Sequence, residues 1–362
     1  MYSQCFVLSA QHAWAKGRIW RVGRIRLTSC SCRFYRFIAL TKVIKSIDTT
    51  GFGCRNFEIF IIFGPCFRFL FLLLSGKTSN MRLIADSGST KTDWLLTEGS
   101  VISAWKTQGI NPCHQQPATI RHILQTELLP FLKGKTTPEL RLSFYGSGCT
   151  AGLVPGMTAL LADVFHLPDG QIEVAGDLLA AARAICGHEE GIACILGTGA
   201  NSCVYDGQNI VNNTPPLGYI LGDEGSGAVL GKRFLNGIFK GSLPPFVRDL
   251  YLKETEQSYE DIIHRVYSEP LANRYLASVA LFIGRHQDEK CLQQLVKDNF
   301  SDFIRRNIQP YKQRLPIGFV GSIAHAFSPL LIEVCHESGY EVSRIEKRPI
   351  EGLLQRYYVD GR

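Results

Sequence analysis

From residue 81 onward, the apolar residues of this chain recur with the spacing of short strands and amphipathic helices. Strand-like runs predict β-strands at residues 82–86, 94–97 and 100–107, which we expect to form an antiparallel meander. Residues 117–132 have apolar side chains three and four positions apart, which predicts a helix. A further strand is predicted at residues 140–145.

The same order of elements then starts again. The first set closes with a helix at 152–165, a strand at 172–175 and an Ala-rich helix at 178–185. The second set has predicted strands at 191–196 and 203–205, an Asn- and Pro-rich hairpin at 209–216, helices from 225 to 310, a strand at 317–320 and a helix at 323–337. We therefore predict an α/β fold of two duplicated half-domains, each a mixed sheet flanked by helices.

The first 80 residues differ from the rest and show no sustained helical or strand period. They hold 12 Lys and Arg against only Asp48 and Glu58, a net charge of +10. Because the whole chain carries +7, residues 81–362 carry −3. We expect residues 1–80 to be a non-native or disordered extension, translated from a misplaced start codon, with Met81 as the functional N-terminus.

Two other interpretations of this extension compete. A basic arm for nucleic acid would need ordered basic and aromatic faces, and none is visible. A signal anchor would use residues 57–74, but that run contains Glu58, Pro65 and Arg68, which are costly in a bilayer core. We therefore expect no nucleic-acid partner and no membrane partner.

The cysteines after residue 80 are scattered, mostly within apolar runs. They show neither a CxxC motif nor a Cys/His cluster, so the sequence gives no indication of a zinc or iron–sulfur site. We expect buried free thiols in a reducing cytoplasm.

The motif DSGSTKTDW begins at Asp86, directly after a predicted strand, and runs into the next one. Gly88 can take positive φ at little steric cost, and the small residues Ser89 and Thr90 let a large anion approach the backbone. This arrangement predicts a hairpin that holds nucleotide phosphates beside Lys91, while Asp86 holds Mg²⁺ through water. A tight solvent hairpin with a solvated lysine is the alternative.

A second turn of small residues, Gly197-Thr198-Gly199, separates two predicted strands of the second set. Two strand–turn–strand units predict two half-domains that each offer a hairpin to one polyphosphate. Neither turn matches the Walker pattern GxxxxGKS/T, or the dinucleotide fingerprint GxGxxG before a helix. These patterns argue against a P-loop enzyme and a Rossmann dehydrogenase.

Six motifs in this order resemble the actin-like ATPase fold, and within it the N-acetylglucosamine kinase branch of the BadF/BadG ATPase family. They are DSGSTKTDW, GIN, GDLLAAARA, LGTGANS, LGYILGDEGSG and GFVGSIA, which begin at residues 86, 109, 176, 196, 217 and 318. The resemblance implies a kinase that uses ATP and Mg²⁺ to phosphorylate an amino sugar, with N-acetylglucosamine and its 6-OH as the first candidates. It also implies two actin-like halves, residues 81–188 with the C-terminal segment 346–362 and residues 189–345, and it allows a homodimer.

Asp177 is the candidate general base. It stands where the predicted strand at 172–175 ends and the Ala-rich helix begins. Asp is a favoured N-cap that stabilises a helix by about 1 kcal/mol, so a cap without chemistry is the alternative. The resemblance implies the catalytic role, because related kinases place their catalytic aspartate at the start of this helix. A carboxylate there can accept the proton of a sugar hydroxyl.

The resemblance also implies where the sugar and adenosine bind. Asp223 would accept hydrogen bonds from sugar hydroxyls, although Asp223 or Ser226 could instead cap the next helix. Asn111 would bind the sugar through its amide, with an Asx turn before Pro112 as the alternative. The remaining candidates are Thr198, Asn201 and Gly218 for the sugar, and the turn Gly321-Ser322, otherwise an ordinary βα turn, for adenosine.

Two departures from the kinase pattern leave the exact sugar open. Leu217 precedes Gly218 where close relatives of the eukaryotic enzyme have an aromatic residue, and Ala200 replaces a serine. Glucosamine, N-acetylmannosamine and N-acetylmuramic acid are therefore further candidates, and the role of Glu224 is open. Two other functions compete: an ATPase activator of a 2-hydroxyacyl-CoA dehydratase, which would need cluster-binding cysteines, and a non-catalytic sugar sensor.

Overall fold

The computed structural model describes the strands between residues 13 and 76 by their backbone, and then residues 81–88, 90–98, 101–132, 135 and 137–358. The chain divides into two compact units, Met1–Ser79 and Asn80–Arg362.

The first unit contains a six-stranded antiparallel sheet with the order β1-β2-β4-β5-β6, in which β3 also pairs with β4. Its strands are β1 (Ala13–Ala15), β2 (Arg18–Val22), β3 (Arg26–Cys32), β4 (Tyr35–Lys45), β5 (Asn56–Ile62) and β6 (Phe71–Gly76). Part of the run 57–74 lies outside the described residues. That residues 1–80 are dispensable stays a prediction.

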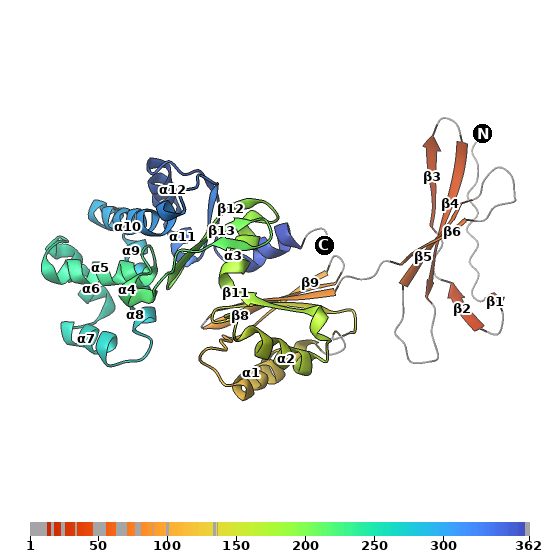
Figure 1. Ribbon diagram of the computed structural model, residues 1–362, viewed down its shortest axis with the longest axis horizontal. Coiled ribbons are helices and arrows are strands. Elements are labelled where there is room, and N and C mark those ends of the chain that lie inside the picture. The colour runs from red at the N-terminus through yellow and green to blue at the C-terminus, as the bar shows by residue number, and fades with distance from the viewer. Residues whose placement is uncertain are drawn as a thin grey trace. The chain divides into compact units, whose positions relative to one another are not determined.

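The second unit begins with a five-stranded sheet of order β11-β10-β7-β8-β9 (Figure 1). The strands β7 (Met81–Ser87), β8 (Lys91–Glu98) and β9 (Val101–Gln108) form the predicted antiparallel meander. On the other side of β7, β10 (Arg141–Gly146) and then β11 (Ile172–Gly176) add in parallel. The parallel strands place the C-terminal ends of β7, β10 and β11 at one edge.

A second five-stranded sheet repeats this topology in the order β14-β13-β12-β15-β16. The strands β12 (Glu190–Leu196), β13 (Ala200–Asp206) and β14 (Ile210–Asn212) are antiparallel, and β15 (Ile317–Val320) and β16 (Val342–Glu346) add to β12 in parallel. The predicted α/β fold with two duplicated, mixed sheets is confirmed. The strand β16 was missed by the sequence analysis.

Helices cover the first sheet and join it to the second. The helix predicted at 117–132 is present, but it begins as α1 (Pro117–Ile123) and ends in a π-helical turn, Leu124–Leu128, and a 3-10 turn, Leu129–Leu132. The change follows from Pro130, which has no N–H to donate to the preceding turn. Two further helices are α2 (Val154–Phe165) and α3 (Asp177–Cys186).

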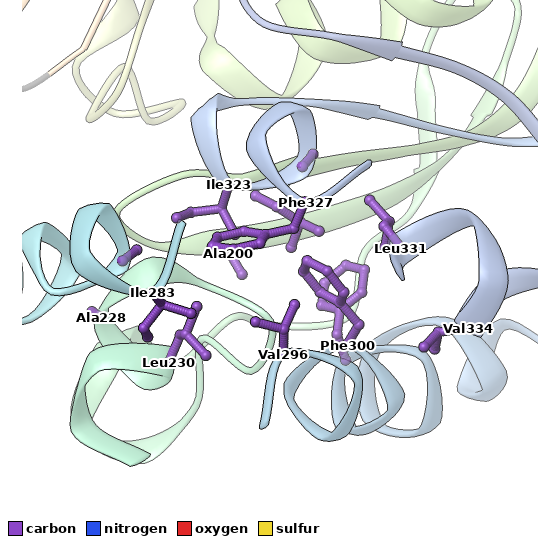
Figure 2. Packing of buried hydrophobic residues seen from close by; sticks show 14 of the residues in the cluster. Ala200, Ala228, Leu230, Ile283, Val296, Phe300, Ile323, Phe327, Leu331 and Val334 are labelled. Atoms are coloured by element: carbon purple, nitrogen blue, oxygen red, sulfur yellow. The ribbon is translucent and has the colours of Figure 1, made fainter. Parts of the chain in front are cut away.

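The second half is rich in helices. Those before β15 are α4 (Gly218–Leu221), α5 (Gly227–Lys240), α6 (Pro245–Thr255), α7 (Tyr259–Tyr267), α8 (Ala272–Ser278), α9 (Ala280–Arg285) and α10 (Lys290–Phe303), which continues through the turns Ile304–Ile308 and Gln309–Tyr311. Figure 2 shows part of their core, where Phe300 and Val296 of α10 lie near Leu331 and Phe327. Among the described residues, every helix is too short or too polar to cross a lipid bilayer.

The prediction of a single helix at 323–337 is wrong in one respect, because this segment forms two helices. The first is α11 (Ser322–Ala326) and the second is α12 (Ser328–Glu337), with a break at Phe327, where φ is −114° and ψ is 27°. Pro329 lies in the first turn of α12 and cannot donate a helical hydrogen bond, so it favours a helix start there. Phe327 is fully buried at the break.

The C-terminal segment returns to the first half. It contains α13 (Pro349–Gly352) and a π-helical turn, Leu353–Tyr357. Ile350 and Leu353 join Ile84 of β7 and Ala184 of α3 in one buried cluster. Arg356 donates from Nη1 to the carbonyl oxygen of Ala184 at 2.8 Å. The end of the chain therefore packs on the helix that begins with Asp177.

Candidate active site

The turn between β7 and β8 is the predicted phosphate hairpin of the first half. The amide of Gly88 donates to Lys91 O at 3.0 Å, and Thr90 O accepts from Gly109 N at 3.1 Å. Ser89 lies outside the described residues. Lys91 is exposed and pairs with Asp93, with 2.9 Å between Nζ and Oδ2. The turn is thus held to the start of β8 and to the loop after β9.

Asp86 lies near the end of β7 in a region where negative charge exceeds positive charge. Burial raises the pKa of Asp86, and the charges of Asp177 and of its cross-strand partner Asp93 raise it further, to about 7. The cations of Lys91 and Arg348 oppose this rise. The carboxylate of Asp86 therefore has more negative than positive charge around it. Such a carboxylate is suited to Mg²⁺, which prefers hard oxygen ligands.

Asp177 is the first residue of α3. Gly176 occupies the N-cap position before it, with extended backbone and no side-chain cap. The carboxylate of Asp177 accepts hydrogen bonds from its own amide and from that of Leu178, which lower its pKa, but burial dominates and the pKa is raised. From the sequence, a helix cap and a general base are the alternatives for Asp177. Asp177 stands one position inside the helix and also contacts its first amides.

The turn between β12 and β13 presents free amides. Its carbonyl groups are occupied at the start of α5, because Gly197 O accepts from Gly227 N at 2.8 Å and Thr198 O from Ala228 N at 3.1 Å. Within the described part of the chain, the amides of Thr198 and Gly199 have no hydrogen-bond acceptor. Two unsatisfied N–H groups in a tight turn suit a phosphate group.

Asp223 lies directly against this turn. A Cβ on Gly199 would be 3.0 Å from Oδ2 of Asp223, so only a glycine lets the carboxylate lie there undisturbed. Burial raises the pKa of Asp223, although the Ala200 amide donates to its carboxylate and opposes the rise. The cap of α5 is Ser226, whose Oγ accepts from Val229 N at 3.1 Å. The capping alternative therefore belongs to Ser226.

Two other predicted sugar ligands of the second half belong to segments that contact Asp223, the loop at Pro216 and the start of β13 at Ala200. Gly218 begins α4, and the loop closes where Asp223 N donates to Pro216 O at 2.9 Å. Asn201 lies on β13, where its Oδ1 accepts from Asn213 Nδ2 at 2.9 Å. Glu224 accepts from Asn307 Nδ2 at 3.3 Å.

The predicted adenosine turn, Gly321-Ser322, joins β15 to α11. Gly321 has a φ of +123°, and a Cβ there would overlap Leu196 O and lie 3.2 Å from Gly197 N. The turn is a βα turn, as the alternative proposed, and it also lies directly against the second phosphate turn. Two segments predicted to contact ATP are therefore adjacent.

Asn111 forms the predicted Asx turn, since its Oδ1 accepts from Cys113 N at 2.9 Å. The turn is tied to the first phosphate hairpin, because Ser87 Oγ accepts from Ile110 N at 2.9 Å. The Asx turn and sugar binding do not exclude each other. The turn uses the amide oxygen and leaves Nδ2, which has no hydrogen-bond partner among the described residues.

Two residues of the site were missed by the sequence analysis. Arg348, after β16, lies 3.8 Å from Asp93, measured from Nη1 to Oδ1. The Cα of Gly148 lies against the side chain of Asn111. Nothing local in the sequence marks either residue, because each meets its partner only when distant segments pack together.

Comparison with solved structures places this architecture in a family. A putative N-acetylglucosamine kinase from Porphyromonas gingivalis is 43% identical, with a TM-score of 0.74 over 78% of this chain and 100% of that one. This chain belongs to the family of that protein. The match covers the whole length of the relative.

A second putative N-acetylglucosamine kinase, from Chromobacterium violaceum, is 19% identical, with a TM-score of 0.59 over 76% of this chain and 98% of that one. At this identity the likeness concerns the fold. No family model and no curated protein matches the chain.

Proposed function

We propose that this protein transfers the γ-phosphoryl group of ATP to a hydroxyl group of an amino sugar, with N-acetylglucosamine as the leading substrate and 6-OH as the leading acceptor. The observation that carries this proposal is the placement of Asp86 and Asp177 at the same edge of the first sheet, where Asp86 lies near the end of β7 and Asp177 directly follows β11 in the parallel set β7-β10-β11. In agreement with this placement, the charge of Asp177 raises the pKa of Asp86. A candidate base and a candidate metal ligand thus share one site. The 43% identical relative, named a putative N-acetylglucosamine kinase, supports the choice of reaction.

For phosphoryl transfer, the protein must mainly position the reactants and neutralise the charge on the phosphates. The amides of Thr198 and Gly199 and the turn at Gly88 would bind the phosphates, and the turn at Gly321 would take the adenosine. Mg²⁺, held by Asp86 through water, would neutralise charge on the phosphates. These groups belong to both halves of the unit.

Asp177 would accept the proton of the attacking hydroxyl group. Its raised pKa makes it a stronger proton acceptor once ionised, and its place at the first turn of α3 fixes its direction. Asp223 and Asn111 would orient the sugar ring. Because Asp223 lies against Gly199, sugar and phosphate would be held by neighbouring residues.

The test is a coupled ADP-release assay of the purified protein with a panel of amino sugars. We expect slow ATP hydrolysis without sugar, and at least about a tenfold stimulation, or ~1.4 kcal/mol in activation free energy, by an accepted sugar. Product analysis would identify the phosphorylated hydroxyl. Rapid hydrolysis unchanged by every sugar would favour an ATPase activator, and sugar binding without turnover would favour a sensor. The predicted homodimer and the wider BadF/BadG relationship stay predictions.

A further inference from the structure

Two turns that are distant in the sequence meet at Asn111. One is the loop after β9 that contains Asn111, and the other is the turn after β10 that contains Gly148. The side chain of Asn111 lies on the Cα of Gly148, and Cys113 Sγ lies 3.2 Å from Gly148 O. Gly148 thus contacts the Asn111 loop through both its Cα and its carbonyl group.

The orientation of the Asn111 amide is determined by its partners. The atom that faces Cys113 N must be an acceptor, because a backbone N–H can only donate, and this identifies it as Oδ1. The backbone around it is held as well: Asn111 N donates to Gln115 Oε1 at 2.9 Å, and Gln115 Nε2 donates to Gly109 O at 2.9 Å. Oδ1 is thus bonded to Cys113 N and crowded by Gly148, whereas Nδ2, a hydrogen-bond donor, has no partner among the described residues and is the group that the side chain offers to a ligand.

Gly148 is the residue that allows this arrangement. Its φ is +85°, and a Cβ there would overlap Oδ1 of Asn111 and lie 2.9 Å from Cγ and 3.1 Å from Nδ2. The turn cannot easily move away, because Thr150 N donates to Gly148 O at 2.8 Å and Cys149 N to Gly146 O at 3.1 Å. Any side chain at position 148 must displace the amide of Asn111.

We propose that Gly148 is a positioning residue for sugar recognition. Because it has no side chain, the Asn111 amide can take the orientation in which Nδ2 donates a hydrogen bond to an acceptor oxygen of the amino sugar. The group recognised is a hydroxyl or an N-acyl carbonyl oxygen, since an ammonium group has no lone pair to accept. This inference rests on the proposed function, and it adds a residue and a direction of hydrogen bonding to it.

The test is a double-mutant cycle of Gly148→Ala and Asn111→Ala in the full-length chain, with Gly152→Ala as the matched control. Gly152 lies in the same connection between β10 and α2, has no positive φ, and has nothing within 4 Å of a built Cβ. We expect Gly148→Ala to raise the sugar KM about five- to tenfold, the loss of one hydrogen bond, and to leave the KM for ATP unchanged. In the Asn111→Ala background the same change should leave the sugar KM unaltered, and Gly152→Ala should resemble the wild type.

Measurement of the Tm by thermal unfolding distinguishes a loss of Asn111 positioning in Gly148→Ala from the backbone strain that the same substitution causes. The strain of alanine at positive φ should lower the Tm of Gly148→Ala in both backgrounds, whereas the effect on sugar KM should appear only when Asn111 is present. If Gly148→Ala does not fold, Gly148→Asn replaces it, because Asn tolerates positive φ and carries the same Cβ. Monodeoxy sugars identify the acceptor: the analogue that lacks it should lose affinity for the wild type and not for Asn111→Ala.

An unchanged sugar KM in Gly148→Ala, or an equal increase in both backgrounds, would overturn the positioning role. Sugar binding measured by calorimetry distinguishes this failure from that of the proposed function. Binding without turnover would refute the kinase and still allow the cycle to be measured as dissociation constants. If no amino sugar is bound or phosphorylated, both the proposed function and the role of Gly148 are refuted.

Discussion

The metal-free protein should gain stability when Asp86 is replaced by Asn. Burial and the charges of Asp177 and Asp93 raise the pKa of Asp86 from 3.8 to about 7, so its ionised form is unfavourable in the fold. A pKa change from 3.8 to about 7 lowers the free energy of unfolding by about 4 kcal/mol once the pH exceeds both values. Because Asp86 is only partly buried, solvent screens part of the effect, and we expect about 2 kcal/mol.

The sign of the pH dependence follows from the direction of the pKa change. Well below pH 3.8, Asp86 is protonated in both the folded and the unfolded state, so it does not lower the free energy of unfolding. As the pH rises from about 4 to about 7, the unfolded state loses the proton first, and the free energy of unfolding of the wild type falls. Asp86→Asn has no such charge, so its advantage should grow over this range and level off above it.

Urea unfolding in EDTA at several pH values, followed by tryptophan fluorescence, measures this difference, and Trp94, buried in β8, lies beside the site. Asp169→Asn serves as a control because Asp169 is exposed. The same Asp86→Asn variant should lose kinase activity, since the residue that destabilises the apo protein is the candidate metal ligand. A variant no more stable than the wild type at neutral pH, or an advantage independent of pH, would refute the electrostatic argument.

Three further changes test other parts of the site. Asp177→Asn should lower kcat by roughly 10²–10⁴-fold with little change in ATP or sugar binding; near-normal turnover in a folded variant would leave Asp177 as a helix residue without catalytic function. Gly321→Ala should raise the KM for ATP and lower the free energy of unfolding by about 2 kcal/mol, because its Cβ would meet backbone at positive φ; Gly170→Ala, where a Cβ has open space, is the control, and equal effects would contradict the assignment. A chain that starts at Met81 should be an active kinase, because every candidate residue belongs to the second unit; loss of soluble expression would show that residues 1–80 contribute to the fold.

The sequence by itself determined the elements and their repetition. Strand periodicity, helical spacing and small-residue turns are properties of a few neighbouring residues. The meander at β7–β9, the two small-residue turns and the position of Asp177 at a helix start could therefore be predicted from local patterns. Local sequence also contained the break at Phe327, because Pro329 marks a helix start, but the periodicity of the apolar residues continues across it.

Tertiary structure decided what these residues can do. The sequence left open whether Asp223 or Ser226 caps α5, and packing resolved it by placing Asp223 against Gly199 and Ser226 Oγ on Val229 N. Arg348 contacts Asp93, and Gly148 contacts the side chain of Asn111, only because segments far apart in the chain are packed together. The raised pKa of Asp86 likewise depends on burial and on neighbouring charges from other strands and helices. Desolvation and charge proximity are properties of the folded surroundings, so no local pattern encodes them.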